Sequence, residues 1–225
     1  MIVVIESFNA NKYLNLMEKM FRLRARIFQT RKQWDVQVID GKECDKYDKL
    51  GPVYIVYTDD EMSEVKGSLR LLPTTGPTLF SEFFADCVSD AAALSAPAIW
   101  ECSRLCVDEK IVAGGYKEIV HTTAVMLGAL GDLAIKAGIE TLVCNFDAPM
   151  LRLYRRIGCE IDVVGHTLRY GKPIYLGLHH ISEDIVRRVE TKYKEANSPA
   201  EREASFARGI PGRSTESYLP VGRGA

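Results

Sequence analysis

Charged residues of both signs gather in one short stretch near the N-terminus. Arg24 begins this stretch, and Asp45 and Asp48 end it three residues apart. A second polar group, 101–104 in the run WECSR, lies far away in the sequence. A partly buried site tolerates such charges when each has a partner of opposite sign. We therefore expect the two segments to meet in one cleft.

A mixed-sign cluster of this kind suits a zwitterionic ligand. Asp45 or Asp48 can hold an ammonium group, while an arginine can hold a carboxylate through two parallel hydrogen bonds. Glu101 is the candidate general base, because a carboxylate on a strand that faces a half-buried cleft has a raised pKa. Ser103 shares its strand face and either binds a substrate carbonyl or orients Glu101. Taken singly, each charge also fits a surface ion pair.

The order and spacing of these residues resemble the acyl-homoserine-lactone synthase (LuxI-type autoinducer synthase) family. The resemblance extends from about residue 20 to 160 and rests on one set: Arg24-x3-Phe28-x5-Trp34, Asp45-x2-Asp48, Arg70 in the run LRLLPTT, and Glu101-x2-Arg104. It implies a pocket for S-adenosylmethionine, which is a co-substrate and not a permanently bound cofactor. It also implies catalytic roles for the residues Glu101, Arg24, Asp45, Asp48, Arg104 and Ser103.

Two aromatic residues and a third arginine extend the implied substrate site. Phe28 and Trp34 match family positions near the bound co-substrate, where an aromatic ring faces a sulfonium or an adenine. Plain core packing is the alternative for both. Arg70 matches a family position too, either as a substrate-binding residue or as an ion-pair brace for the carboxylates.

The resemblance further implies an acyl thioester donor and an apolar tunnel for its chain. Candidate lining residues are Phe84, Phe146 and Met150, each of which is equally consistent with an ordinary core. Family members that use 3-oxo chains often carry a threonine near 144–145. Its absence here favours an unsubstituted or branched chain.

A basic cluster on a short predicted helix is the candidate docking site for the donor. Arg152, Arg155 and Arg156 would attract the strongly acidic acyl carrier protein. The same arginines could instead hold the phosphates of acyl-CoA, or form a solvated helix face. The sequence leaves the donor open.

We therefore expect an acyltransferase that makes a quorum-sensing autoinducer and releases 5'-methylthioadenosine. One alternative is a GNAT-type N-acyltransferase that acts on another amine. The Gly-rich pyrophosphate loop of such enzymes is missing, and GGYK at 114–117 is a poor match. The other alternative is a non-catalytic small-molecule-binding protein that kept the pocket.

Composition excludes several other classes of protein. The 29 basic and 30 acidic residues give a net charge of −1, which indicates no nucleic-acid partner. We expect no membrane span and no secretory signal, so the cytoplasm is the expected location. The six scattered cysteines predict reduced thiols and no metal site.

Strands alternate with helices along the chain, which predicts a mixed sheet covered by helices on both faces. Strands are expected at 2–5, 34–39, 53–58, 64–72, 98–107, 141–146, 159–165 and 173–178. Helices are expected at 9–30, 117–137, 148–157 and 182–196, with a short helix or turn at 79–84. The resemblance implies a three-layer α/β/α sandwich, related to GNAT acyltransferases, whose central sheet is splayed. One domain, 1–196, would precede a flexible C-terminal tail, 197–225.

Overall fold

One mixed sheet organises the described part of the chain. The computed structural model describes residues 1–225 except 109, 111–115, 169–170 and 197–225. The sheet has the strand order β1-β4-β5-β6-β7-β9-β8. Its strands are β1 (Ile2–Ile5), β4 (Val53–Thr58), β5 (Val65–Pro73), β6 (Ile99–Val107), β7 (Thr141–Asp147), β8 (Asp162–Thr167) and β9 (Ile174–His180). The tail expected at 197–225 lies outside the described residues.

Neighbouring strands pair antiparallel except β6 and β7, which are parallel. A parallel pair needs a crossover connection, and α2 (Tyr116–Ala137) supplies it. The other helices are α1 (Leu14–Ala25), α3 (Ala148–Arg156) and α4 (Glu183–Ala196). A small hairpin of β2 (Val38–Ile39) and β3 (Lys42–Glu43) stands apart from the main sheet.

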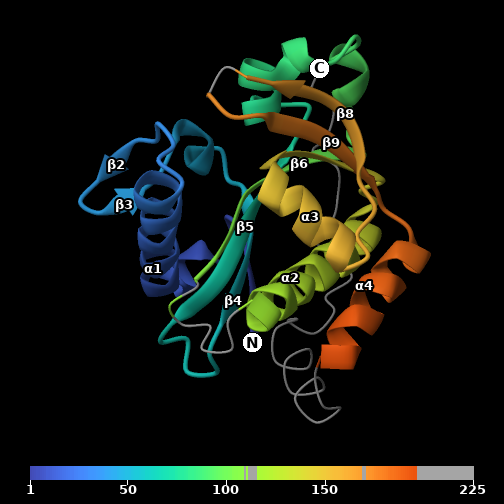
Figure 1. The fold of residues 1–225 in the computed structure, drawn as a ribbon. Helices are drawn as coiled ribbons and strands as arrows, with labels where there is room; N and C mark the ends of the chain where they lie inside the picture. The colour runs from blue at the N-terminus through green and yellow to red at the C-terminus, as the bar shows by residue number, and fades with distance from the viewer. Residues whose placement is uncertain (109, 111–115, 169–170, 197–225) are drawn as a thin grey trace, which may run out of the picture.

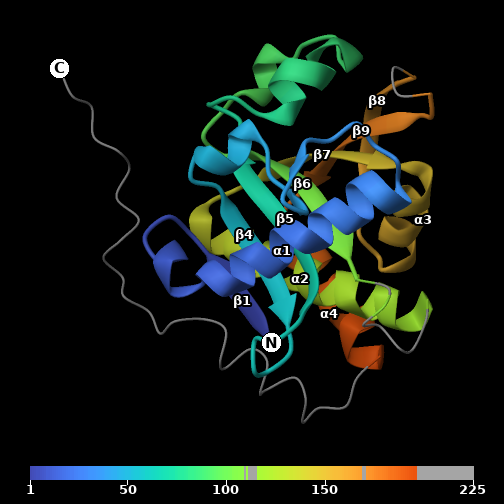
Figure 2. The same cartoon turned by 90° about the vertical axis from the view of Figure 1, so that its left-hand side faces the viewer.

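The helices cover both faces of the sheet, as predicted (Figures 1 and 2). Successive residues of a strand point to opposite faces, so β4 contributes to two separate cores. Tyr54 and Val56 pack in the cluster that includes Met20 of α1. Ile55 packs in the cluster on the other face, which includes Leu130 of α2. The three-layer α/β/α fold is confirmed.

The sheet splits between its two central strands. The pairing of β6 with β7 begins at Ile99–Thr141 and ends at Cys102–Cys144, although both strands continue. Beyond that point β6 pairs only with β5, and β7 pairs only with β9. The register of β5 and β6 also shifts here, and Arg104 adopts a left-handed φ of 57°. This break is the splay that the family resemblance implied.

The strand expected at 34–39 is mostly wrong. After α1 the backbone continues in wide helical turns over Arg26–Arg31, and only Val38 and Ile39 are in strand conformation. The Trp34 N–H donates to the carbonyl of Phe28 at 2.9 Å, and the two rings stack at 5.3 Å. The stacking of Trp34 on Phe28 therefore holds this part of the chain against the end of the helix, and residues 34–37 pair with no strand that the structure describes.

One helix segment, Glu118–Ala137, is long and apolar enough to cross a membrane by length and composition alone. The sequence predicts no membrane span. In the fold 61% of the segment is buried, and its residues pack against the sheet and α4. A core helix of a globular protein passes the same test, so no span is indicated.

We predict that two glycines three residues apart on α2 respond oppositely to alanine. A Cβ on Gly131 would lie 2.5 Å from Cγ2 of Val186 on α4, whereas a Cβ on Gly128 meets nothing within 4 Å. Gly131→Ala should lower the free energy of unfolding by about 1–2 kcal/mol through overpacking. Gly128→Ala should raise it by about 0.5–1 kcal/mol, because alanine loses less backbone entropy. Urea unfolding followed by circular dichroism measures both, and equal effects would contradict this α2–α4 packing.

Candidate active site

Arg24 is a buried cation at the end of α1. Its side chain is fully buried between the helix and the sheet. The Nε atom donates to Oε2 of Glu43 at 2.6 Å, while Nη1 and Nη2 donate to the two oxygens of Asp48 at 2.8 and 2.9 Å. This two-pronged geometry is the strongest form of arginine–carboxylate pairing. Arg24 therefore fixes two carboxylates that lie five residues apart.

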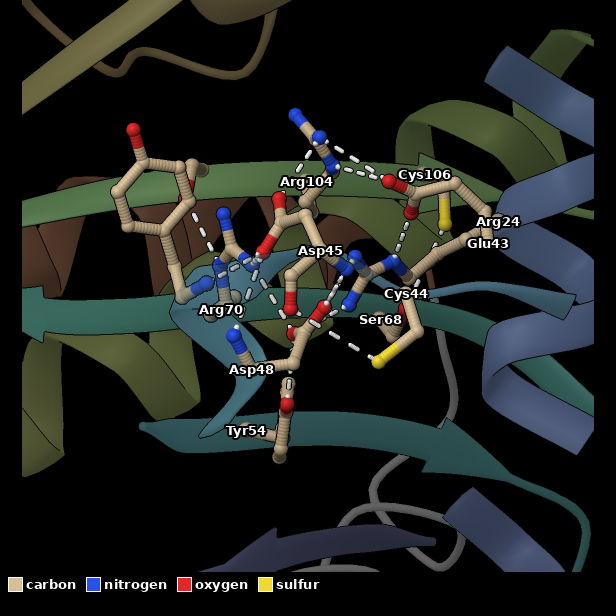
Figure 3. Close-up of polar contacts among 12 residues, drawn as sticks. Arg24, Glu43, Cys44, Asp45, Asp48, Tyr54, Ser68, Arg70, Arg104 and Cys106 are labelled. Atoms are coloured by element: carbon tan, nitrogen blue, oxygen red, sulfur yellow. Dashed lines mark hydrogen bonds and ion pairs between the residues drawn. The ribbon is translucent and has the colours of Figure 1, made fainter. Parts of the chain in front are cut away.

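Two further arginines close the contacts into a ring (Figure 3). Nη1 of Arg70 donates to Asp45 at 2.6 Å and to Asp48 at 3.0 Å. Arg104 donates to Asp45 at 2.9 Å and to Glu43 at 3.1 Å. Each arginine thus touches two carboxylates and each carboxylate touches two arginines. We call this set the ion ring: Arg24, Glu43, Arg104, Asp45, Arg70 and Asp48, in that cyclic order.

The three-residue spacing of Asp45 and Asp48 has a structural reason. Together they form a capping box around the short helical turn Lys46–Lys49. The Asp45 side chain accepts from the N–H of Tyr47 and of Asp48, and the Asp48 side chain accepts from the N–H of Asp45 at 2.8 Å. Such a box holds both carboxylates in one orientation. The loop can therefore present a rigid pair of anions to the arginines.

The ion ring is dry on one side and open on the other. The side chains of Arg24, Glu43, Asp48 and Arg70 are at most 1% exposed, but Arg104 is 11% and Asp45 16% exposed. Burial alone would raise the pKa of Asp48, yet the hydrogen bonds and charge of Arg24 hold it well below its usual range. Asp48 therefore stays ionised, and its contribution to stability is lost only as the pH falls below the ordinary carboxyl range.

Glu101 lies next to the ion ring but is not part of it. The side chain is fully buried on β6, and its Oε2 accepts the N–H of Phe80 at 2.6 Å. Its Oε1 is buried and has no hydrogen-bond partner among the described residues; the same holds for Nη2 of Arg70. Burial raises the pKa of Glu101, although the Phe80 N–H and the charge of Arg70 oppose this effect. These features are those of a general base held ready for a substrate proton.

Ser103 and the predicted aromatic pair complete this side of the site. Ser103 Oγ accepts from Nε of Arg70 at 3.3 Å, so the hydroxyl touches the ion ring. Phe28 lies under the guanidinium of Arg104 at 5.4 Å and stacks on Trp34. Trp34 also packs against the apolar cluster that contains Phe84. Phe28 therefore borders the ion ring as a buried residue in contact with both Arg104 and Trp34, whereas Trp34 contacts Phe28, Lys32 and the apolar clusters.

Other predicted residues lie elsewhere. Phe84 packs with Val143 in the cluster just described. Phe146 belongs to the core on the opposite sheet face, where its ring meets Tyr154 edge-on at 5.4 Å, and Met150 packs against that same core. The basic cluster of α3 is exposed and distant from the ion ring in sequence: Arg152, Arg155 and Arg156. Acyl binding by Phe84, Phe146 and Met150, and carrier docking by the arginines, stay predictions.

The sequence analysis missed two members of the site. Glu43 is fully buried and bridges Arg24 to Arg104. Tyr54 donates its hydroxyl to Asp48 at 2.7 Å. A count of charges does not reveal Glu43, because the three predicted arginines were already balanced by three predicted carboxylates, Asp45, Asp48 and Glu101. No sequence signal separates Tyr54 from Tyr57, the other tyrosine of the strand.

A small apolar cavity lies on the opposite face of the sheet, beneath α2 and α4. Its lining includes Cys102 and Cys144, the last paired residues of β6 and β7, together with Leu130, Tyr154 and Val189. Buried Cys102, Cys144 and Cys159 are free thiols. Burial keeps the Cys159 thiol neutral by raising its pKa to about 12, so it is a poor nucleophile. In the described residues no group of His, Cys, Asp and Glu side chains could hold a metal ion.

Comparison with known proteins assigns the family. Residues 8–189 match the autoinducer synthase family. This chain belongs to that family. An acyl-homoserine-lactone synthase of Rhizobium etli is 36% identical over 171 residues, which are 76% of this chain and 79% of the relative. The family and the acyltransferase class predicted from the sequence are thereby confirmed.

Solved structures agree on the fold. The acyl-homoserine-lactone synthase LasI superposes with a TM-score of 0.73 at 27% identity, covering 85% of this chain and 94% of LasI. The CoA-dependent synthase BjaI, solved with S-adenosylmethionine and isopentyl-CoA, gives 0.73 at 24% identity, covering 88% and 90%. A putative N-acetyltransferase from Lactobacillus plantarum gives 0.53 at 15% identity, covering 80% and 99%, in line with a GNAT-like fold.

We predict that Arg24→Ala lowers the free energy of unfolding by about 3–5 kcal/mol, because it leaves Glu43 and Asp48 buried without their shared cation. The matched control is Arg22→Ala. Arg22 lies on the same helix but pairs with Glu18 at the surface, where a pair contributes less than about 1 kcal/mol. Urea unfolding of both variants measures the difference. Similar losses in the two variants would contradict a buried, mutually dependent ion ring.

Proposed function

We propose that this autoinducer synthase is a cytoplasmic enzyme that joins S-adenosylmethionine to an acyl thioester and closes the homoserine lactone. The observation that carries this proposal is Glu101, a buried carboxylate beside the ion ring. Its pKa is raised, and one of its oxygens has no hydrogen-bond partner among the described residues. A relative 36% identical along most of the chain is named an acyl-homoserine-lactone synthase.

Charge balance supports S-adenosylmethionine as the co-substrate. Three arginines and three carboxylates make the ion ring formally neutral. Ionised Glu101 adds one negative charge next to it. S-adenosylmethionine carries a sulfonium, an ammonium and a carboxylate, hence one net positive charge. A buried pocket with one uncompensated negative charge favours such a ligand over a neutral amino acid.

In the first step Glu101 acts on the α-ammonium of S-adenosylmethionine. A protonated amine has no lone pair, so Oε1 of Glu101 takes a proton, directly or through a water. The free amine then attacks the thioester carbonyl carbon, an amide bond forms, and the carrier leaves as a thiol. Nη2 of Arg70 has no partner in the described chain and is available to hold the methionyl carboxylate.

The second step, lactone closure, depends on the orientation of the substrate and needs no general acid or base. The methionyl carboxylate oxygen attacks its own γ-carbon, and the C–S bond to the sulfonium breaks with loss of 5'-methylthioadenosine. The sulfonium leaves as a neutral thioether, so the step requires no metal. Phe28 is buried against Arg104 and Trp34, so of the two aromatics the half-buried Trp34 offers ring surface to the sulfonium or the adenine.

The break in the sheet offers a place for the acyl chain. It begins at Cys102 and Cys144, which also line the cavity under α2 and α4. A chain whose thioester lies beside Glu101 reaches that cavity by passing through the break. For the carrier we propose Arg152, Arg155 and Arg156 as the docking surface, whether the donor is acyl carrier protein or acyl-CoA. Because the structure of BjaI contains isopentyl-CoA, an assay of this enzyme must include acyl-CoA donors.

We predict that the purified enzyme converts S-adenosylmethionine and a thioester to a lactone and 5'-methylthioadenosine in equal amounts. The assay is mass spectrometry with a matched panel of acyl-carrier-protein and acyl-CoA donors. Glu101→Gln keeps the size and hydrogen-bonding shape of the side chain but cannot take a proton, so kcat/KM should fall by about 10²–10⁴. Because burial raises the pKa of Glu101, wild-type activity should fall on acidification at a pH above the ordinary glutamate value of about 4.3.

Glu140→Gln is the control, since Glu140 is exposed just before β7 and should leave the rate unchanged. Amide formed on an unrelated amine, without consumption of S-adenosylmethionine, would support the N-acyltransferase alternative instead. Full activity of Glu101→Gln, with an unchanged pH profile, would remove Glu101 from the mechanism.

A further inference from the structure

Asn145 is a half-buried polar residue, with a fully buried side-chain amide, that the reaction described above does not use. It lies on β7, one residue beyond Cys144, where the pairing with β6 has just ended. Both Nδ2 and Oδ1 are buried, and neither has a hydrogen-bond partner among the described residues. Exchanging the two atoms of the amide would leave the same two positions unpaired. A buried amide of this kind is costly to the folded protein unless a ligand or water completes it.

The register places Asn145 on the same sheet face as Glu101. Paired residues of neighbouring strands share a face, and Val143 pairs with Glu101 while Asn145 pairs with Leu176. Val143 and Leu176 belong to one apolar cluster, which also contains Phe84. Asn145 therefore lies one side-chain repeat, about 6.6 Å, beyond the level of Glu101 along β7.

This position is on the path proposed for the acyl chain. The thioester carbonyl must lie near the amine that Glu101 deprotonates. From there the chain enters the break between the strands, which Ser103 of β6 and Asn145 of β7 flank on the Glu101 face. The carbons that follow the carbonyl thus come level with the unpaired amide.

We propose that Asn145 hydrogen-bonds a hydroxyl group close to the thioester, so that the enzyme selects 3-hydroxyacyl donors. A hydroxyl both donates and accepts, which satisfies Oδ1 and Nδ2 together. A 3-oxo group only accepts and leaves Oδ1 unpaired, while a methylene satisfies neither atom. The expected order of donors is therefore 3-hydroxy, then 3-oxo, then unsubstituted. This inference rests on the proposed synthase function.

The absence of a threonine near 144–145 pointed to an unsubstituted or branched chain. That expectation came from the family resemblance and considered only threonine as a hydrogen-bonding residue at this position. The unpaired amide supplies the same kind of hydrogen-bonding groups from a different side chain. The two views predict opposite donor preferences, so one experiment decides between them.

The test is competition between donors of equal chain length that carry 3-hydroxy, 3-oxo or no substituent, offered both on acyl carrier protein and on CoA. We expect wild type to favour the 3-hydroxy donor by at least about ten-fold in kcat/KM. Asn145→Leu removes both polar atoms at nearly equal size and should abolish this preference while it keeps turnover of the unsubstituted donor. Asn145→Thr restores a hydroxyl and should recover part of the preference.

A second readout does not depend on turnover. Calorimetric binding of the matched 3-hydroxyacyl and unsubstituted homoserine lactones should show the same preference in wild type and its loss in Asn145→Leu. Thermal unfolding checks the fold of the variant, which should be at least as stable as wild type. Equal use and binding of both chains by wild type, or a preference that survives Asn145→Leu, would overturn the inference. Lactone formation without that preference would leave the synthase function intact, whereas no lactone from any donor would count against the function itself.

Discussion

Pairing of three arginines with three carboxylates at the centre of the fold is the constraint on which the rest of this structure depends. Arg24, Arg70 and Arg104 come from a helix and two strands, and none can be desolvated without carboxylates in bidentate or bridging contact. The hairpin and capping box at 38–49 supply those carboxylates. Within this small region Tyr47 is the large buried apolar side chain, and it lies against Arg70, so ion pairs and the packing of this ring together hold the region over the sheet.

Pairing within the ion ring also distinguishes Glu101 from the other carboxylates of the site, because no arginine among the described residues hydrogen-bonds to Glu101. Each carboxylate of the ion ring contacts two arginines, and those contacts keep Asp48 ionised, whereas Glu101 is fully buried and accepts one backbone N–H from Phe80. The site thus contains two kinds of carboxylate: three that contact arginines, of which Asp48 has a lowered pKa, and Glu101, whose charge is costly because it is buried without a described arginine in hydrogen-bond contact. A substrate cation can relieve that cost, which couples binding to the protonation state needed for the reaction.

The sheet contributes to the proposed acyl-binding part of the site, because the pairing of β6 with β7 ends early. Because β6 and β7 are paired over only four residues, the face that carries Glu101 and the cavity beneath α2 and α4 both border the same break. The backbone bulge at Arg104 lies next to this break. It directs the Arg104 guanidinium toward Glu43 and Asp45, and it coincides with the point where β6 and β7 separate. Bulges next to active sites commonly serve such re-aiming.

Much of this was predictable from the sequence, for identifiable reasons. The strand at 53–58 is rich in β-branched and aromatic residues, the strand at 141–146 is a short apolar run, and the long helix at 117–137 has a clear apolar period. The predicted ranges of all three agree closely with the structure. The site residues Arg24, Asp45, Asp48, Arg70 and Arg104 were recognisable by type and spacing, and the structure joins them. Glu43 was missed because a single glutamate in a charged loop has no local signal.

Tertiary contacts account for the failures. Trp34 was assigned to a strand on alternation, but stacking on Phe28 bends the chain away from the sheet. The roles of Asn145 and of the break depend on register between strands distant in sequence, which no local pattern encodes. Registers of this kind follow from the packing of whole faces.

The most direct test of the account is the affinity for S-adenosylmethionine as a function of pH, measured by calorimetry for wild type and Glu101→Gln. The comparison belongs to the acidic range in which the α-amine, with an ordinary pKa of about 8, stays protonated. If Glu101 is the uncompensated charge of the site, wild-type affinity should rise as the pH increases through the Glu101 pKa and then level off. The affinity of Glu101→Gln should be lower and independent of pH over that range. Parallel curves for the two proteins would contradict the central claim that ionised Glu101 is the charge the substrate compensates.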